Sequence, residues 1–184
     1  MPNNIRLDAI GSNKILYKQF AGDVESIGER KVRFIITTAA PDRERDIVET
    51  SGIDTANFER NPVVLFAHDY KQMPIGRCVQ IERLPDQLIA TVEFMAADIN
   101  PFADQIFRAV KAKFLRATSI GFRPLEWHYD EARRGVHFQK TELLEFSIVP
   151  VPANAEALIA ASVAGIDTSV LKGWAEQTLK ALRQ

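Results

Sequence analysis

The 184-residue sequence has a single cysteine, no long apolar run and no excess of either charge. One cysteine excludes a disulfide framework and any metal site built from several thiolates. Because 23 Lys and Arg residues are balanced by 24 Asp and Glu residues, no basic surface for nucleic acid is predicted. No stretch approaches the about 18 consecutive apolar residues of a transmembrane helix, and Met1–Asp8 lack the apolar core of a signal peptide. We therefore expect a soluble cytosolic protein that binds neither nucleic acid nor membrane.

Apolar residues are nonetheless plentiful, at 46% of the chain, and 184 residues are enough for one domain with a well-buried core. Segments rich in Val, Ile, Leu, Phe and Tyr and bounded by turn residues predict β-strands up to residue 149. These predicted strands span residues 13–20, 31–38, 63–66, 75–83, 87–95, 117–127 and 136–149. Many short strands with one helix among them predict a mainly β, α+β fold: a closed or nearly closed antiparallel β-barrel surrounded by helices.

One helix is predicted with a defined start, since Asn100 is a favourable cap and Pro101 suits the first turn. Its apolar residues repeat every four positions, and we expect the resulting stripe to pack against the core. The stripe consists of Phe102, Ile106, Val110 and Phe114. A shorter helix is predicted over residues 53–60, before Pro62.

The chain changes character after Pro152. Residues 153–164 are alanine-rich and residues 167–182 are amphipathic, and both segments predict helices. We therefore divide the chain into a barrel-type domain, residues 1–160, and a C-terminal helical segment, residues 161–184. This segment is expected to pack on the barrel or to form a dimer contact.

Three polar residues stand where their side chains could take part in catalysis. His68 follows the apolar run V-V-L-F-A, at the point where a buried strand meets a polar loop, which gives an imidazole a rigid mount and an accessible edge. Ser119 and Gly121 share one face of a predicted strand, while Ile120 points to the other. Glu145 lies in an otherwise apolar strand, where a carboxylate needs a partner.

Together His68, Ser119 and Glu145 supply the parts of an activated nucleophile. A serine hydroxyl is nearly inert at neutral pH and needs an adjacent base, and the base needs a carboxylate that orients it and stabilises its charged form. Simpler interpretations stay open at this point. Ser119 fits a strand without further purpose, and Glu145 can pair with an arginine such as Arg123 or Arg116.

Five segments between residues 42 and 157 carry a resemblance to a known family. They are D-R-E-R-D-I-V-E-T-S-G-I (Asp42–Ile53), N-P-V-V-L-F-A-H-D-Y (Asn61–Tyr70), P-I-G-R (Pro74–Arg77), A-T-S-I-G-F (Ala117–Phe122) and L-L-E-F-S-I-V-P-V-P-A-N-A-E-A (Leu143–Ala157). In this order the chain resembles the prohead maturation proteases of tailed bacteriophages, whose fold is related to the herpesvirus assemblin proteases. The last two segments are the most specific.

The resemblance implies a serine endopeptidase with a herpesvirus-protease-like fold. Carried over by position, His68 is the general base and Ser119 the nucleophile. The herpesvirus relatives place a second histidine at the third position, whereas the matching strand here holds Glu145. We prefer Glu145 because a carboxylate orients and charges an imidazole more effectively than another imidazole does.

Three further residues remain as alternatives. His128 and His137 are candidates for the third member of the triad in place of Glu145. Ser147, two residues along the strand from Glu145, is an alternative nucleophile.

The same resemblance implies a substrate inside the immature capsid: the scaffold protein or the scaffold-like part of the major capsid protein, and the protease itself. The site of action would be the assembling prohead in the cytoplasm of the infected bacterium. A homodimer or larger homo-oligomer is expected, with no metal and no organic cofactor.

Two other functions were weighed against this one. A catalytically inactive capsid-assembly or scaffold-binding protein on the same fold would use the apolar stripe of residues 153–184 to bind its partner. A metal hydrolase using His68, Asp69 and another histidine is poorly supported, because the sequence has no H-E-x-x-H or comparable ligand spacing.

Overall fold

The computed structural model describes residues 15–21, 24–42 and 44–151. Its strands are β1 (Leu16–Ala21), β2 (Val24–Ser26), β3 (Lys31–Thr38), β4 (Ile47–Val48), β5 (Ile53–Asp54), β6 (Val63–Phe66), β7 (Gly76–Arg83), β8 (Gln87–Phe94), β9 (Ala117–Asp130) and β10 (Gly135–Val149). Its helices are η1 (Thr50–Gly52), α2 (Ala56–Arg60) and α3 (Pro101–Lys111). The predicted helices at 153–164 and 167–182, and the division at residue 160, lie outside the described residues.

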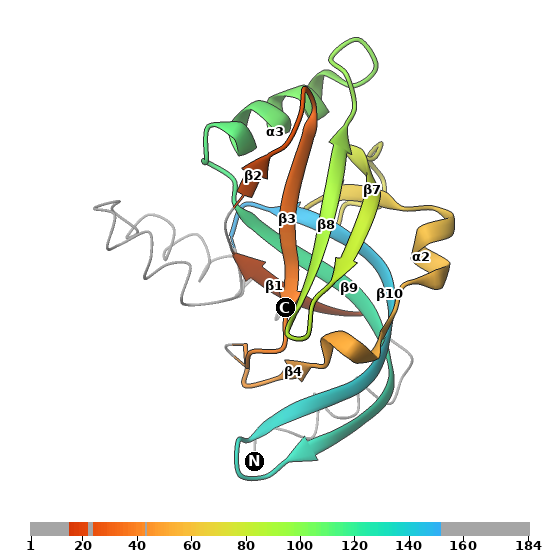
Figure 1. Cartoon of the computed structure of the whole chain (residues 1–184), viewed down its shortest axis with the longest axis vertical. Coiled ribbons are helices and arrows are strands. Elements are labelled where there is room, and N and C mark those ends of the chain that lie inside the picture. Colours follow the sequence, from red (N-terminus) through yellow and green to blue (C-terminus); the bar gives the residue numbers. More distant parts are fainter. Residues whose placement is uncertain (1–14, 22–23, 43, 152–184) are drawn as a thin grey trace, which may run out of the picture.

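The strands form one strongly curled sheet in the order β1-β9-β10-β6-β7-β8-β3-β2. Figure 1 shows β3, β8 and β7 crossing over β9 and β1, and β3 lies against both β1 and β9. The sheet is therefore a half-barrel: within the described part of the chain, its order runs from β1 at one edge to β2 at the other without closing. The fold is mainly β with few helices, as expected from the sequence.

The expectation of a purely antiparallel sheet is wrong at β10. This strand pairs antiparallel with β9, but it pairs in parallel with β6 and with the short strands β4 and β5. The pattern of apolar residues within each strand is the same for either direction, so it could not reveal which strand lies beside which. The parallel pairing matters because it brings the end of β6 to the end of β10.

One apolar cluster built from both halves of the curled sheet forms the core. Its largest fully buried members include Phe34 on β3, Leu88 on β8, Phe122 on β9 and Phe146 on β10. Burial of each such side chain stabilises the fold by about 1.5–3 kcal/mol relative to exposure.

Helix α3 starts where the sequence predicts and buries a different set of side chains. Ile106 and Val110 are buried with Phe107, whose ring lies 5.3 Å from that of Phe94. The expected burial of the whole stripe is wrong at its ends, because Phe102 is 41% exposed and Phe114 is 86% exposed. The helix ends at Lys111, so Phe114 lies beyond its last turn.

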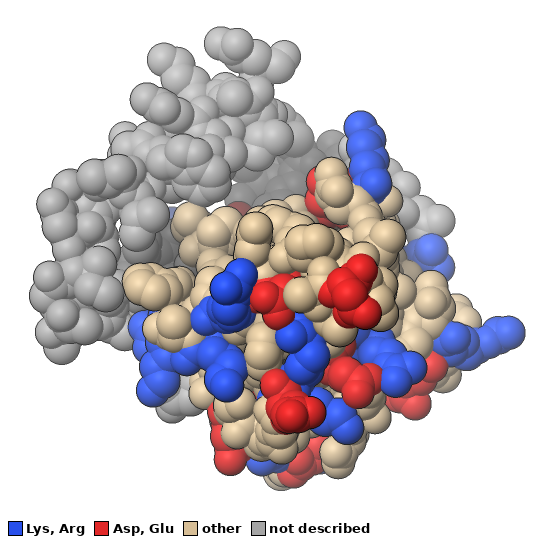
Figure 2. All heavy atoms as spheres, turned by 90° about the horizontal axis from the view of Figure 1, so that it is seen from above, with Lys and Arg blue, Asp and Glu red and all other residues tan. Residues whose placement is uncertain are grey.

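Strands β9 and β10 form a long hairpin that reaches beyond the rest of the sheet (Figure 1). The surface seen from above carries Lys and Arg interspersed with Asp and Glu (Figure 2), in keeping with a formal net charge of −1. No helix within the described ranges is both long and apolar enough to cross a membrane.

Candidate active site

Three side chains that are distant in the sequence meet at one place on the sheet. His68 Nε2 lies 2.7 Å from Ser119 Oγ, and His68 Nδ1 lies 2.7 Å from Glu145 Oε1. Ser119 is fully buried and Glu145 is 2% exposed, while the His68 side chain retains 15% exposure. The hydroxyl, the imidazole and the carboxylate thus form one hydrogen-bonded line.

Neighbouring strands place the hydroxyl and the carboxylate side by side. Ser119 on β9 is paired with Ser147 on β10, and Gly121 is paired with Glu145. A β-carbon at Gly121 would lie 2.3 Å from Glu145 Oε1, closer than side chains approach. Gly121 therefore leaves the space that the carboxylate occupies.

A β-bulge directs Glu145 toward the site. Simple alternation along β10 predicts that Leu143, Glu145 and Val149 share a face, and this is wrong for Leu143. The register shifts between Leu143 and Glu145, so Leu143 pairs with Phe122 and joins the core, while Glu145 pairs with Gly121. The extra residue, Leu144, changes the face on which the following side chains lie.

His68 stands just beyond β6, on a backbone that is held in an unusual conformation. Ala67 and His68 have φ angles of 53° and 57°, in the left-handed region that residues other than glycine rarely adopt. The Ala67 N–H donates to the Ile148 carbonyl at 3.0 Å, and the His68 N–H donates to Ser147 Oγ at 3.1 Å. Both bonds attach this turn to β10.

Two tyrosines that could not be predicted from the sequence lie at the site. The Tyr17 ring on β1 lies 4.2 Å from the His68 ring, and its hydroxyl shares a hydrogen bond of 3.4 Å with that of Tyr70. Desolvation, this hydrogen bond and the negative charge of Glu145 raise the pKa of Tyr70 well above its usual range. Tyr17 could have been found only from the pairing of β1 with β9, which brings it opposite Gly121.

The alternative third members lie elsewhere on the long hairpin. His128 and His137 face each other with ring centres 5.1 Å apart, roughly 30 Å along β9 from Ser119 at about 3.3 Å per residue. His137 Nε2 contacts Glu49 Oε1 at 2.6 Å, and His128 Nδ1 contacts Gln139 Oε1 at 3.4 Å. The structure does not bring either histidine to His68.

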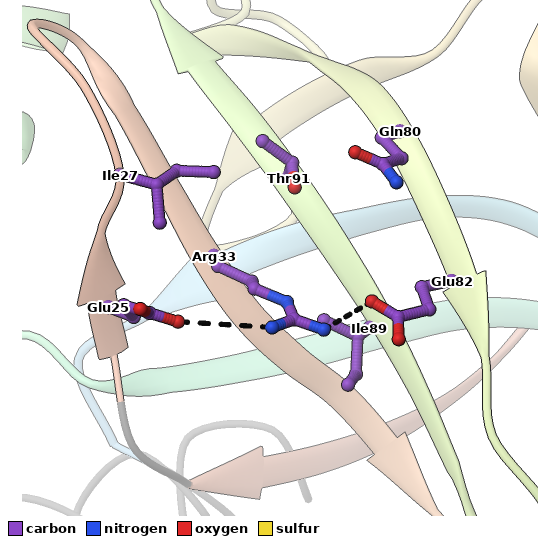
Figure 3. A pocket seen from close by; sticks show the side chains of 7 residues that line it. All are labelled: Glu25, Ile27, Arg33, Gln80, Glu82, Ile89 and Thr91. Carbon is purple, nitrogen blue, oxygen red and sulfur yellow. Dashed lines mark hydrogen bonds and ion pairs between the residues drawn. The ribbon is translucent and has the colours of Figure 1, made fainter.

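A separate pocket lies over strands β2, β3, β7 and β8. It has a volume of about 300 Å³, and in Figure 3 Arg33 at its centre points between Glu25 and Glu82 and forms ion pairs with both. Because these carboxylates neutralise the arginine, we assign no chemistry to the pocket. Across the described residues, no group of three or more His, Cys, Asp or Glu side chains could hold a metal ion.

A hydroxyl, an imidazole and a carboxylate joined in this order form the arrangement with which serine hydrolases activate a hydroxyl. The chain belongs to the caudovirus prohead serine protease family, whose model matches residues 35–170.

Similar proteins come from several tailed phages. The prohead protease of Escherichia phage T5 is 34% identical over 135 residues, which make up 71% of this chain and 61% of that protein. A capsid polyprotein of Pseudomonas phage PAJU2 is 30% identical over 143 residues, which make up 76% of this chain and 21% of that protein. The chain thus spans less than two-thirds of the length of either relative.

A solved structure shares the fold. The capsid assembly protease of bacteriophage T4 matches with a TM-score of 0.57 and 10% identity, covering 76% of this chain and 98% of that one.

Proposed function

We propose that the protein is a serine endopeptidase of prohead maturation, with Ser119 as nucleophile, His68 as general base and Glu145 as the acidic member of the triad. The observation that carries the proposal is the pair of 2.7 Å contacts that His68 makes, one with each of the other two residues. Family membership supports the protease class. We prefer Glu145 to His128 and His137 as the third member because Glu145 alone among them contacts His68.

The proposed reaction follows from the geometry. Ser119 Oγ attacks the carbonyl carbon of the scissile peptide bond as its proton passes to His68 Nε2. His68 then gives this proton to the leaving amine as the C–N bond breaks. Water attacks the acyl-enzyme next and passes one proton to His68, which returns it to Ser119 Oγ as the new carboxylic acid leaves with the other proton of the water. Throughout, the Glu145 carboxylate stabilises the imidazolium form of His68.

The proposed substrate is a capsid precursor. The relatives are named prohead protease, capsid polyprotein and capsid assembly protease, and these names favour the scaffold protein or the scaffold-like part of the capsid protein as the target. We also propose that the chain cleaves itself and acts as a homo-oligomer inside the assembling prohead of the infected bacterium. Confinement within a shell raises the effective concentration of enzyme and substrate, so modest intrinsic activity suffices.

The fold supports a finer comparison. We propose that the curled sheet corresponds to the barrel of the herpesvirus assemblin proteases, opened between β1 and β2. The close packing of β3 on β1 and β9 supports this relation.

The proposal is tested by Ser119→Ala, with Ser26→Ala on the exposed edge strand β2 as the matched control. Each variant is co-expressed with the capsid precursor, and cleavage is followed by gel electrophoresis and mass spectrometry. We expect Ser119→Ala to lose cleavage by several orders of magnitude while its melting temperature stays close to that of the control. Full cleavage by Ser119→Ala would refute the nucleophile assignment.

A chemical probe provides an independent measurement. A serine-directed phosphonate should form one adduct, located on Ser119 by mass spectrometry, and the Ser119→Ala variant should form none. Failure of the native chain to react, even in the assembled shell, would favour the inactive scaffold-binding alternative.

A further inference from the structure

We propose that Ser147 is a positioning residue that holds the Glu145 carboxylate and the His68 backbone in place and thereby selects the tautomer of His68. The proposal rests on the proposed function and deepens it, since it explains how the general base is prepared before any substrate arrives. It starts from one juxtaposition: a single buried hydroxyl contacts both the backbone of His68 and the side chain of Glu145.

The Ser147 side chain is fully buried on β10, directly opposite Ser119. Its Oγ lies 3.1 Å from the backbone nitrogen of His68 and 2.9 Å from Glu145 Oε2. The other oxygen of the same carboxylate, Oε1, lies 2.7 Å from His68 Nδ1. Ser147, Glu145 and His68 therefore form a closed ring of hydrogen bonds that passes through the His68 backbone.

The direction of each hydrogen bond in this ring can be deduced. A backbone N–H can only donate, so Ser147 Oγ must accept the hydrogen bond from His68. The single hydroxyl hydrogen of Ser147 is then free to point at Glu145 Oε2, and the hydroxyl donates to that oxygen at 2.9 Å.

The proton between Glu145 Oε1 and His68 Nδ1 belongs on the imidazole. A proton on Oε1 would leave a carboxylic acid beside an unprotonated Nδ1, although imidazole is a stronger base than a carboxylate. The hydrogen bond that Ser147 donates to Oε2 also holds the carboxylate so that Oε1 faces Nδ1. Nδ1 therefore carries the hydrogen, and the lone pair of Nε2 faces Ser119 Oγ, as a general base requires.

The same hydroxyl also supports the strained turn that carries the imidazole. Ala67 and His68 are consecutive non-glycine residues with positive φ, a conformation that persists only where surrounding contacts hold it. The hydrogen bond from the His68 N–H to Ser147 Oγ is one of the contacts that hold this turn against β10. Ser147 thus fixes the position of the histidine as well as its tautomer.

This role excludes Ser147 as the alternative nucleophile. Its hydrogen is given to Glu145 and its oxygen accepts from the His68 N–H, so it makes no contact with the basic Nε2.

The test compares Ser147→Ala with Thr141→Val, which removes another buried hydroxyl from the same strand. Thr141 Oγ1 has no hydrogen-bond partner among the described residues, so its loss controls for the removal of a buried β10 hydroxyl in general. The first readout is the nitrogen-15 NMR spectrum of the three histidines, with His68 assigned through a His68→Asn variant. We expect native chain and Thr141→Val to show a protonated Nδ1 and an unprotonated Nε2, and Ser147→Ala to show a mixture of tautomers.

The second readout is turnover of a capsid-derived peptide. We expect kcat of Ser147→Ala to fall by about tenfold to a hundredfold with little change in KM, the range usual for residues that orient a catalytic group. If Ser147→Ala does not fold, Ser147→Cys replaces it: the thiol nearly keeps the shape but is a weak donor and acceptor, so the same tautomer mixing is expected. An unchanged His68 spectrum and kcat within twofold of native would overturn the proposal.

The NMR readout needs no turnover. A chain that lacks peptidase activity but shows the tautomer change would refute the proposed function and leave the role of Ser147 standing. An active chain whose His68 spectrum does not change in the Ser147→Ala variant would support the proposed function and refute the role of Ser147.

Discussion

At the residue scale, Gly121 matters because it has no side chain in the space that the Glu145 carboxylate occupies. A β-carbon at Gly121 would lie 2.3 Å from the Glu145 carboxylate and 3.2 Å from the Tyr17 ring. The S-x-G motif in β9 thus supplies the Ser119 hydroxyl and, at Gly121, the space for the Glu145 carboxylate.

Gly121→Ala is expected to displace Glu145 and lower kcat/KM by about a hundredfold or more, because a small misplacement of a catalytic group has effects of this size. Gly28→Ala is the matched control, since a β-carbon there would meet only the Lys31 Cβ at 3.7 Å. Peptide turnover and melting temperature are measured for both. Equal activity of the two variants would contradict the space-keeping role.

Lys18 is a second residue whose environment has a measurable consequence. It is 4% exposed, and its Nζ donates to the Thr38 and Ala40 carbonyls at 3.0 Å each. Burial lowers the pKa of Lys18 from 10.5 to about 8, against the opposing effect of Asp42 and Asp46. The folded chain therefore releases this proton at lower pH than the unfolded chain does.

Between pH 8 and 10.5 the unfolded state holds more protons at this position than the folded state, so the contribution of Lys18 to the free energy of unfolding should rise with pH. The rise is at most about 3 kcal/mol. Urea unfolding of native chain and Lys18→Met at pH 7, 9 and 10 should show that the free energy of unfolding of the native chain minus that of the variant rises with pH. A constant difference would show that the amine titrates normally.

At the scale of elements, the start of α3 shows how local sequence determines local structure. The Asn100 side chain accepts hydrogen bonds from the Phe102 and Ala103 N–H groups, and its Nδ2 donates to the Pro74 carbonyl. Cap and first turn were both visible in the sequence because they depend only on neighbouring residues.

Asn100→Ala is expected to lower the free energy of unfolding by about 1 kcal/mol through the loss of this cap. Asn61→Ala, at an exposed position, is the control and should change stability by less than about 0.5 kcal/mol. Denaturant unfolding measures both. Equal losses of stability in the two variants would mean that the Asn100 cap stabilises the fold no more than an exposed asparagine does.

Features that depend on contacts between elements could not be predicted. Strand alternation predicted that Ser119 and Gly121 share a face, and the prediction is right because β9 pairs regularly with β1 over this stretch. The same rule was wrong for Leu143, since the bulge beside it arises in the pairing of β10 with β9. The chemistry of His68 and Glu145 suggested that they act together, but their proximity depends on the parallel pairing of β6 with β10, which the sequence pattern does not reveal.

At the scale of the whole molecule, the site gathers residues from nearly the full described length. Tyr17 comes from β1, His68 follows β6, and Ser119 and Glu145 come from β9 and β10. Contacts over such sequence separations make folding slow, because long loops must close before the contacts form. They also make the geometry of the site depend on the whole sheet. A substitution that loosens any of these strands should therefore alter the position of His68 relative to Ser119 and Glu145.

The central position of β10, the last described strand, has a consequence for synthesis on the ribosome. This strand separates β9 from β6 in the sheet, and it carries both Glu145 and Ser147. In a growing polypeptide that ends before residue 135, the hydroxyl and the imidazole have no strand to join them. An activity that depends on these residues would stay silent during translation and would appear only after β10 had been inserted between β9 and β6.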